Sequence, residues 1–67
     1  MVEITIKEAR VQAGLSQQDV AAKLGVSRQA YANMEQNPGS VKVDTARRIC
    51  SILGTEYERI FFSSFAN

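Results

Sequence analysis

The chain has 67 residues, 45% of them hydrophobic, and its eight basic and seven acidic side chains leave a formal net charge of +1. A single cysteine excludes an internal disulfide, and the lack of histidine excludes the usual zinc-finger ligand sets. No apolar run is long enough to span a bilayer, and residues 1–7 do not resemble a signal peptide. We therefore expect one all-α domain over residues 1–67, cytoplasmic, stabilised by packing and without metal or cofactor.

Capping signals mark the first two helices. Thr5–Glu8 places a hydroxyl at an N-cap and a carboxylate three residues later, which predicts a helix start. Gly14 ends this helix, and Ser16–Asp19 offers a second cap of the same kind, for a helix that Gly25 terminates. The inner face of the first helix is expected to carry Ile6, Ala9, Arg10 and Ala13.

Residues 17–35 have the spacing of two short helices joined by a tight turn. Gly25 supplies the turn, Val26 enters the core and Ser27 caps the second of the two helices. Small or apolar residues stand where the two helices must touch, namely Val20, Ala21, Leu24, Tyr31 and Met34. This pattern predicts a helix-turn-helix and indicates double-stranded DNA as the partner.

The outer face of the second motif helix carries Arg28, Gln29, Ala32 and Asn33. Arginine can hydrogen-bond guanine, and glutamine or asparagine can hydrogen-bond adenine. The same residue types are also common on any solvated helix surface. The net charge adds little, because many DNA-binding domains are far more basic, although the middle third of the chain is its positive side.

The second half predicts a turn and two further helices. Gln36–Ser40 contains Asn-Pro-Gly, which favours a turn after the third helix has ended near Glu35. A fourth helix then buries Val43, Ala46, Ile49, Cys50 and Leu53, and leaves Arg47, Arg48 and Ser51 wet. Gly54 ends it, and Thr55–Glu58 repeats the capping pattern for a short fifth helix anchored by Tyr57, Ile60 and Phe61.

The two ends of the chain alternate apolar and polar residues, at 2–6 and at 61–65. This alternation is compatible with a small terminal β-ribbon. The alternatives are a frayed N-terminus and a tail that lies on its own core. Cys50, on the inner stripe of the fourth helix, is expected to act as a small buried hydrophobe rather than as a redox sensor.

The order of these elements resembles the Cro and phage-repressor type of helix-turn-helix domain, the XRE-like family with a five-helix, lambda-repressor-like fold. The resemblance covers about residues 5–62. Its motifs are Leu15–Gln17, Val20–Gln29, Met34–Glu35 and Ile49–Gly54. It implies a transcriptional regulator that places its third helix in the major groove of an operator.

The resemblance also implies roles for individual residues. Arg28, Gln29 and Asn33 match the base-reading positions, and Ser27 and Ala32 could touch a thymine methyl group. The positions that contact phosphate in the family are matched by Ser16, Gln17, Gly39, Ser40 and Lys42. Helix N-termini suit anions in any case.

Two positions allow more than one interpretation. Arg10 and Glu35 match a partly buried ion pair of phage repressors, which the resemblance favours over an Arg10 that reaches solvent and touches phosphate. Tyr31 stands where the family usually has isoleucine or valine. We expect its ring to lie in the core and its hydroxyl to be exposed to solvent, where it could reach a phosphate.

The aromatic tail favours association. Tyr57, Phe61, Phe62 and Phe65 exceed what one small core needs, so we expect them to form a homodimer interface within residues 55–67. The leading hypothesis is a small homodimeric repressor that reads an inverted repeat. The alternative is an antitoxin-like or anti-repressor module that binds another protein through its Phe-rich end. Catalysis is not expected, because neither a nucleophile motif nor a phosphate-cradling glycine loop occurs.

Overall fold

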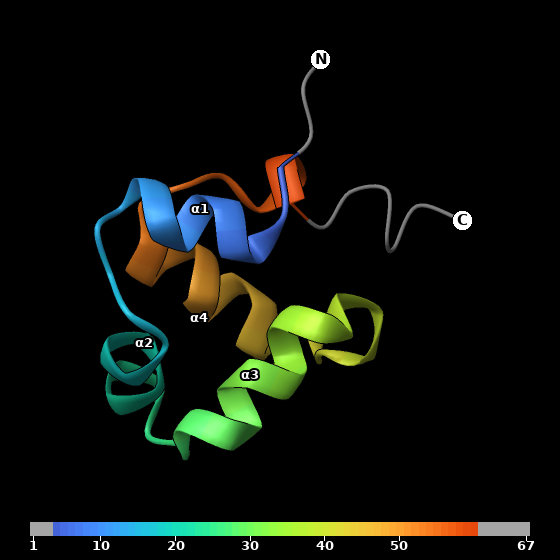
Figure 1. The fold of residues 1–67 in the computed structure, drawn as a ribbon. Coiled ribbons are helices and arrows are strands. Elements are labelled where there is room, and N and C mark those ends of the chain that lie inside the picture. The colour runs from blue at the N-terminus through green and yellow to red at the C-terminus, as the bar shows by residue number, and fades with distance from the viewer. Residues whose placement is uncertain (1–3, 61–67) are drawn as a thin grey trace.

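The computed structural model describes residues 4–60, which contain four α-helices, a short 3₁₀ turn and a further helical segment at 57–60, with no strand among them. The labelled elements are α1 (Ile6–Gln12), α2 (Gln17–Leu24), α3 (Arg28–Gln36), η1 (Pro38–Ser40) and α4 (Val43–Leu53). Figure 1 shows α4 running through the middle of the molecule, with α1 above it and α2 and α3 below. The expected all-α architecture is confirmed.

The predicted caps explain where the first three helices begin. Thr5 and Glu8 form a complete capping box at α1, with hydrogen bonds of 2.8 and 3.0 Å. Ser16 and Asp19 do the same at α2 with two bonds of 3.0 Å. The Ser27 hydroxyl accepts the Ala30 N–H at 3.1 Å and so caps α3. Each cap satisfies amides that a helix start leaves without partners.

The α2–α3 turn depends on one glycine. Gly25 has φ 79°, a left-handed conformation that side-chain-bearing residues rarely adopt, and its N–H bonds back to the end of α2. Arg48 of α4 adds a further link, because its Nη2 donates to the Leu24 carbonyl at 3.4 Å. The turn therefore fixes α3 relative to α2, and the hydrogen bond from Arg48 ties the end of α2 to α4.

A single core joins the helices. Val20, Ile49 and Ala46 are fully buried, and α4 contributes the largest share of the buried side chains. Partly buried hydrophobic side chains pack against this core, namely Ile4, Leu15, Val26, Met34, Ile52 and Tyr57. Cys50 is 3% exposed, and burial raises the pKa of its thiol, which agrees with its expected role as a small hydrophobe.

Three predicted details of the core and caps are wrong. Val43 is 45% exposed because it opens α4 one turn ahead of the core, and Val41 fills that end instead at 6% exposure. Ala13 is exposed because α1 ends before it. Thr55 does not cap the last segment, since within residues 4–60 its buried hydroxyl has no hydrogen-bond partner.

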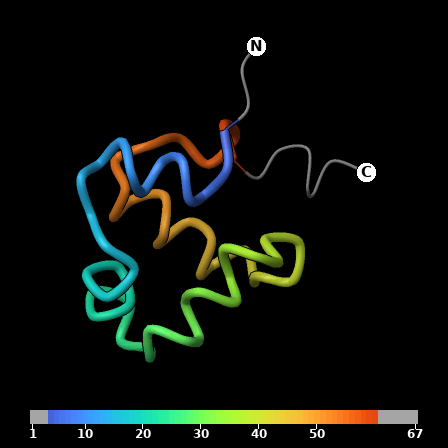
Figure 2. Tube along the Cα trace, in the orientation of Figure 1, coloured from blue at the N-terminus to red at the C-terminus, as the bar shows by residue number. Residues whose placement is uncertain are grey.

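The two ends of the described chain lie side by side, as the tube in Figure 2 shows. The Ile4 N–H donates to the Arg59 carbonyl at 3.2 Å. No strand forms within residues 4–60, and the other residues of the predicted ribbon, 2–3 and 61–65, lie outside the described residues. Among residues 4–60 no helix is long and apolar enough to cross a membrane.

Candidate nucleic-acid interface

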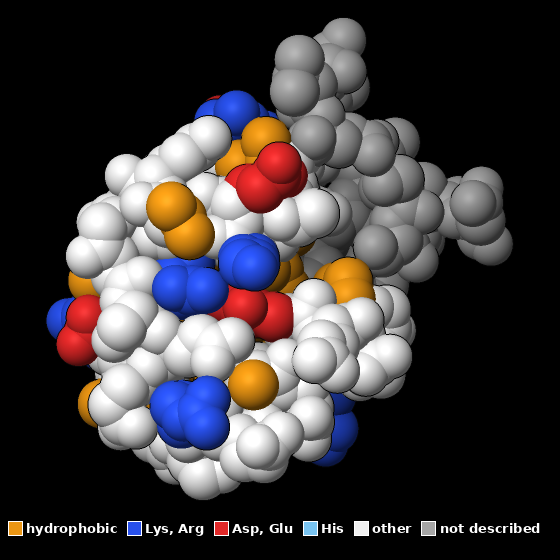
Figure 3. Space-filling model, in the orientation of Figure 1, with side chains coloured by type: hydrophobic (Ala, Val, Ile, Leu, Met, Phe, Trp, Pro, Cys, Tyr) orange, Lys and Arg blue, Asp and Glu red, His pale blue; other side chains and the backbone are white. Residues whose placement is uncertain are grey.

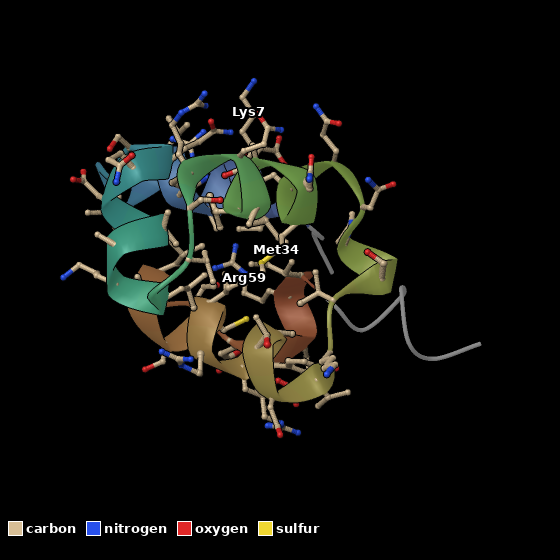
Figure 4. All side chains as sticks on the ribbon, turned by 90° about the horizontal axis from the view of Figure 1, so that it is seen from below. Lys7, Met34 and Arg59 are labelled. Carbon is tan, nitrogen blue, oxygen red and sulfur yellow. The ribbon has the colours of Figure 1, made fainter. Side chains whose placement is uncertain are left out.

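The third helix divides sharply into a buried and an exposed face. Tyr31 is fully buried, and Met34 points into the interior between α3 and α4 (Figure 4). The predicted base-reading side chains Arg28, Gln29 and Asn33 are all exposed. Ser27 is exposed beside them and Ala32 is half-buried. Core packing therefore directs the hydrogen-bonding face of α3 toward solvent.

Arg28 is held by the helix that precedes it in the motif. Its Nη1 donates to the Gln17 Oε1 atom at 3.1 Å. Gln17 in turn donates from Nε2 to the Glu35 Oε1 atom at 3.1 Å. The first residue of α2 thus links the first residue of α3 to a carboxylate near the end of the same helix. The sequence analysis assigned Gln17 only a phosphate contact and missed this bridge. The signal that could have indicated it is that α2 and α3 both begin with a polar residue that can hydrogen-bond.

Glu35 belongs to a partly buried ion pair that ties α1 to α3. Arg10 Nε lies 2.6 Å from Glu35 Oε2, and the two side chains are only 11% and 5% exposed. Arg10 also donates from Nη1 to the Leu15 carbonyl at 2.9 Å. This is the pair that the resemblance implies, and its low exposure disfavours direct contact of Arg10 with a phosphate.

Charge and burial act against each other at this pair. Burial alone would raise the pKa of Glu35, but hydrogen bonds from the surrounding donors, Arg10 above all, outweigh it and lower the pKa. The hydrogen bond to Glu35 correspondingly raises the pKa of Arg10. Both side chains are therefore charged at neutral pH, and protonation of Glu35 would weaken the fold.

Tyr31 requires a correction. Its ring lies in the core as expected, but its hydroxyl is buried rather than wet and forms no hydrogen bond with good geometry within residues 4–60. Burial, together with the nearby Glu35 carboxylate, raises the pKa of Tyr31 far above its usual value. In this structure the hydroxyl is therefore not exposed to a phosphate, and the charged groups that act on it are Glu35 and Arg10.

The phosphate candidates on the α2 side are placed at a helix start. Gln17 is half-buried at the first position of α2, and Ser16 is exposed at its N-cap. The Ser16 N–H donates to Asp19 Oδ2 and the Ser16 Oγ accepts the Asp19 N–H, so the capping box already engages both groups of Ser16. Backbone and hydroxyl hydrogen bonds from Ser16 lower the pKa of Asp19, which keeps a carboxylate at this helix start.

The candidates on the other flank surround η1. Gly39 and Lys42 are exposed, and Lys42 is the N-cap residue of α4. Ser40 does not fit its predicted role, because its N–H and its Oγ both donate to the Asn37 carbonyl, at 3.0 and 2.8 Å. A cavity of about 370 Å³ opens here, and its lining includes Asn33, Met34, Asn37, Ser40, Lys42 and Thr45.

Charge on this side of the molecule is sparse. Figure 3 shows basic side chains scattered on one face beside acidic ones, with uncharged polar surface between them. Lys7, which sequence reasoning did not single out, points away from the body in Figure 4 and lines a small hollow with Gln17, Ala32, Glu35 and Gln36. Hydrogen-bonding amides, rather than a dense positive field, thus dominate the exposed face of α3.

The predicted dimer residues are only partly described. Tyr57 is half-buried against the core, with the Arg47 guanidinium 4.7 Å from its ring centroid. Phe61, Phe62 and Phe65 lie outside the described residues.

One comparison with known proteins agrees with this geometry. A family model described as helix-turn-helix matches residues 6–60, which span every element from α1 to the last helical segment. Neither the search of curated proteins nor that of solved structures gave a match. The family is one of DNA-binding proteins rather than of enzymes. On the strength of the match and of the α2–α3 arrangement, the chain belongs to the Cro and XRE-like helix-turn-helix family of DNA-binding regulators.

Proposed function

We propose that the protein is a homodimeric transcriptional repressor that recognises an inverted repeat through α3. The observation that carries the proposal is the placement of Arg28. Its guanidinium stands exposed on the first turn of α3 and is held by Gln17, a residue of the neighbouring motif helix. Arginine at the start of a recognition helix can bond guanine O6 and N7 in the major groove.

Groups on both sides of α3 can bind the phosphates that border the groove. Ser16 and Gln17 stand at the N-terminus of α2, where helix amides favour an anion. Gly39 and Lys42 stand on the other flank. Since these are few cations, we expect modest affinity and a shallow dependence of binding on salt. Occupancy of the operator alone would then block polymerase.

A dimer would supply the affinity that one recognition helix lacks. A single helix covers only a few base pairs, whereas two linked copies bind half-sites about 34 to 36 Å apart and gain from the linkage. We assign the interface to Tyr57, Phe61, Phe62 and Phe65. The aromatic side chains would leave water on association, which is the main driving force of such contacts.

Selection from random duplex DNA at low salt tests the proposal. Wild type should enrich an inverted repeat with half-site centres about 10 base pairs apart. Arg28→Ala should lose the enrichment. Lys23→Ala is the matched control, because it removes the same charge from an exposed position of α2 and should still select the repeat. Circular dichroism would verify that all three proteins are folded.

The outcomes separate the proposal from its alternative. A folded wild type that enriches no sequence would overturn DNA recognition and favour a protein partner held at the Phe-rich end. In that case Phe62→Ser or Phe65→Ser should abolish activity while Arg28→Ala is tolerated. Enrichment of single half-sites without a repeat would overturn the dimer and retain DNA recognition.

A further inference from the structure

Two base-reading candidates on α3 are bonded to each other. Gln29 and Asn33 stand four residues apart, so their side chains lie one above the other on the same stripe of the helix. Gln29 Nε2 donates to Asn33 Oδ1 at 3.2 Å. Both side chains are exposed, and Arg28 bonds to Gln17 instead of joining them. The exposed face of α3 therefore carries one arginine and one amide pair.

The internal bond determines which polar atoms the pair presents outward. It engages the carbonyl oxygen of Asn33 and one N–H of Gln29. Among the remaining groups are the carbonyl oxygen of Gln29, an acceptor, and the amide nitrogen of Asn33, which retains both of its N–H donors. The pair thus offers an acceptor from one residue and a donor from the next turn of the helix.

From this arrangement we propose that Gln29 and Asn33 act as one reading unit that recognises a single adenine·thymine base pair, a specificity that rests on the proposed function. In the major groove adenine presents N7 as an acceptor and N6 as a donor. The Asn33 amide would donate to N7 while the Gln29 carbonyl accepts from N6. Guanine presents two acceptors, so its O6 would face the Gln29 carbonyl oxygen and be rejected.

This proposal differs from independent reading in a measurable way. If each amide bonded its own base, two neighbouring positions of the half-site would be specified, one by each residue. If the pair is a unit, removal of either member frees the other to rotate, and discrimination is lost at the same position. Residues that share a contact also give non-additive effects in a double-mutant cycle.

The experiment uses the full chain and the operator duplex that selection yields. Fluorescence anisotropy would give the Kd of wild type, Gln29→Ala, Asn33→Ala and the double variant, for that operator and for each single base-pair substitution of one half-site. Gln18→Ala, an exposed glutamine on α2, is the matched control. Alanine favours helix at both positions, so the variants should fold.

We expect each single substitution to weaken operator binding by roughly 5- to 100-fold. Both should also remove the differences in Kd between base pairs at the same position of the half-site. The double variant should lose no more than the weaker-binding single variant. The single variants could instead lose base preference at two different positions, and their fold-losses in operator affinity could multiply in the double variant. That result would overturn the reading unit but not the DNA-binding proposal. A wild type that prefers no sequence would overturn both.

Discussion

Two polar pairs involve α3, one that ties it to α1 and one on its exposed face. Arg10 and Glu35 are charged, nearly buried and 25 residues apart in sequence. Gln29 and Asn33 are neutral, exposed and four residues apart. Loss of one partner of a buried pair leaves an uncompensated charge, whereas an exposed amide exchanges its partner for water at little cost. The first pair is therefore suited to fix the helix in place, and the second is free to bond a ligand.

The largest effect should come from the buried side. Arg10→Met keeps an unbranched apolar stem but leaves Glu35 without its cation, and we expect the free energy of unfolding to fall by about 3 kcal/mol. That is most of the stability that a domain of this size has. Urea denaturation followed by circular dichroism measures it.

A double variant tests whether the loss comes from the uncompensated charge. Arg10→Met with Glu35→Leu removes both charges and should recover most of the stability, because apolar substitutes for a buried pair are often neutral. A double variant as unstable as Arg10→Met would show instead that the bond from Arg10 to the Leu15 carbonyl is the essential contact.

The exposed face should respond in affinity and not in stability. We expect Arg28→Ala to weaken binding to the selected operator by roughly 10- to 100-fold, since a bidentate guanine contact is lost. Its unfolding midpoint should stay at the wild-type value, because Gln17 can exchange Arg28 for water. Anisotropy and urea denaturation together check this. A loss of stability comparable to that of Arg10→Met would erase the distinction between the two faces.

The pH dependence of stability should include a contribution from the buried pair. The pKa of Glu35 is lower in the folded protein than its usual 4.5, so its contribution is complete above about pH 4.5 and is lost as pH falls through the folded pKa. One such proton gives a slope of at most about 1.4 kcal/mol per pH unit. The Glu35→Gln variant should have a lower free energy of unfolding at pH 7, and that free energy should change less between pH 5 and 2 than in wild type. If the free energy of unfolding of the variant depends on pH as steeply as that of wild type, another carboxyl group causes the acid sensitivity, and Asp19 is the next candidate.

Sequence reasoning was most successful where one residue determines local geometry. The capping hydroxyls and Gly25 fixed the helix boundaries, and the apolar spacing separated the two faces of α3. The predictions were wrong where a neighbour distant in sequence decides, as with Val41 in place of Val43, or the burial of the Tyr31 hydroxyl. The bonds from Gln17 to Arg28 and Glu35 likewise depend on how the helices cross, which periodicity does not specify.

The smallest predicted effect concerns Tyr31, which is fully buried in the core. Its buried hydroxyl has no hydrogen bond with good geometry among residues 4–60, and burial of an unpaired polar group costs free energy. We therefore expect Tyr31→Phe to raise the free energy of unfolding by roughly 0.5 kcal/mol and to leave operator affinity unchanged. Denaturation and anisotropy on one preparation would measure both.

The two measurements on Tyr31→Phe have distinct meanings. A fall in stability would show that the hydroxyl supports Glu35 as a donor, and the ion pair would then be a cluster of three side chains. A fall in affinity at unchanged stability would mean that the hydroxyl reaches a phosphate after all, which requires α3 to move outward on the operator. If neither occurs, Tyr31 is a packing residue whose hydroxyl serves neither the ion pair nor the operator.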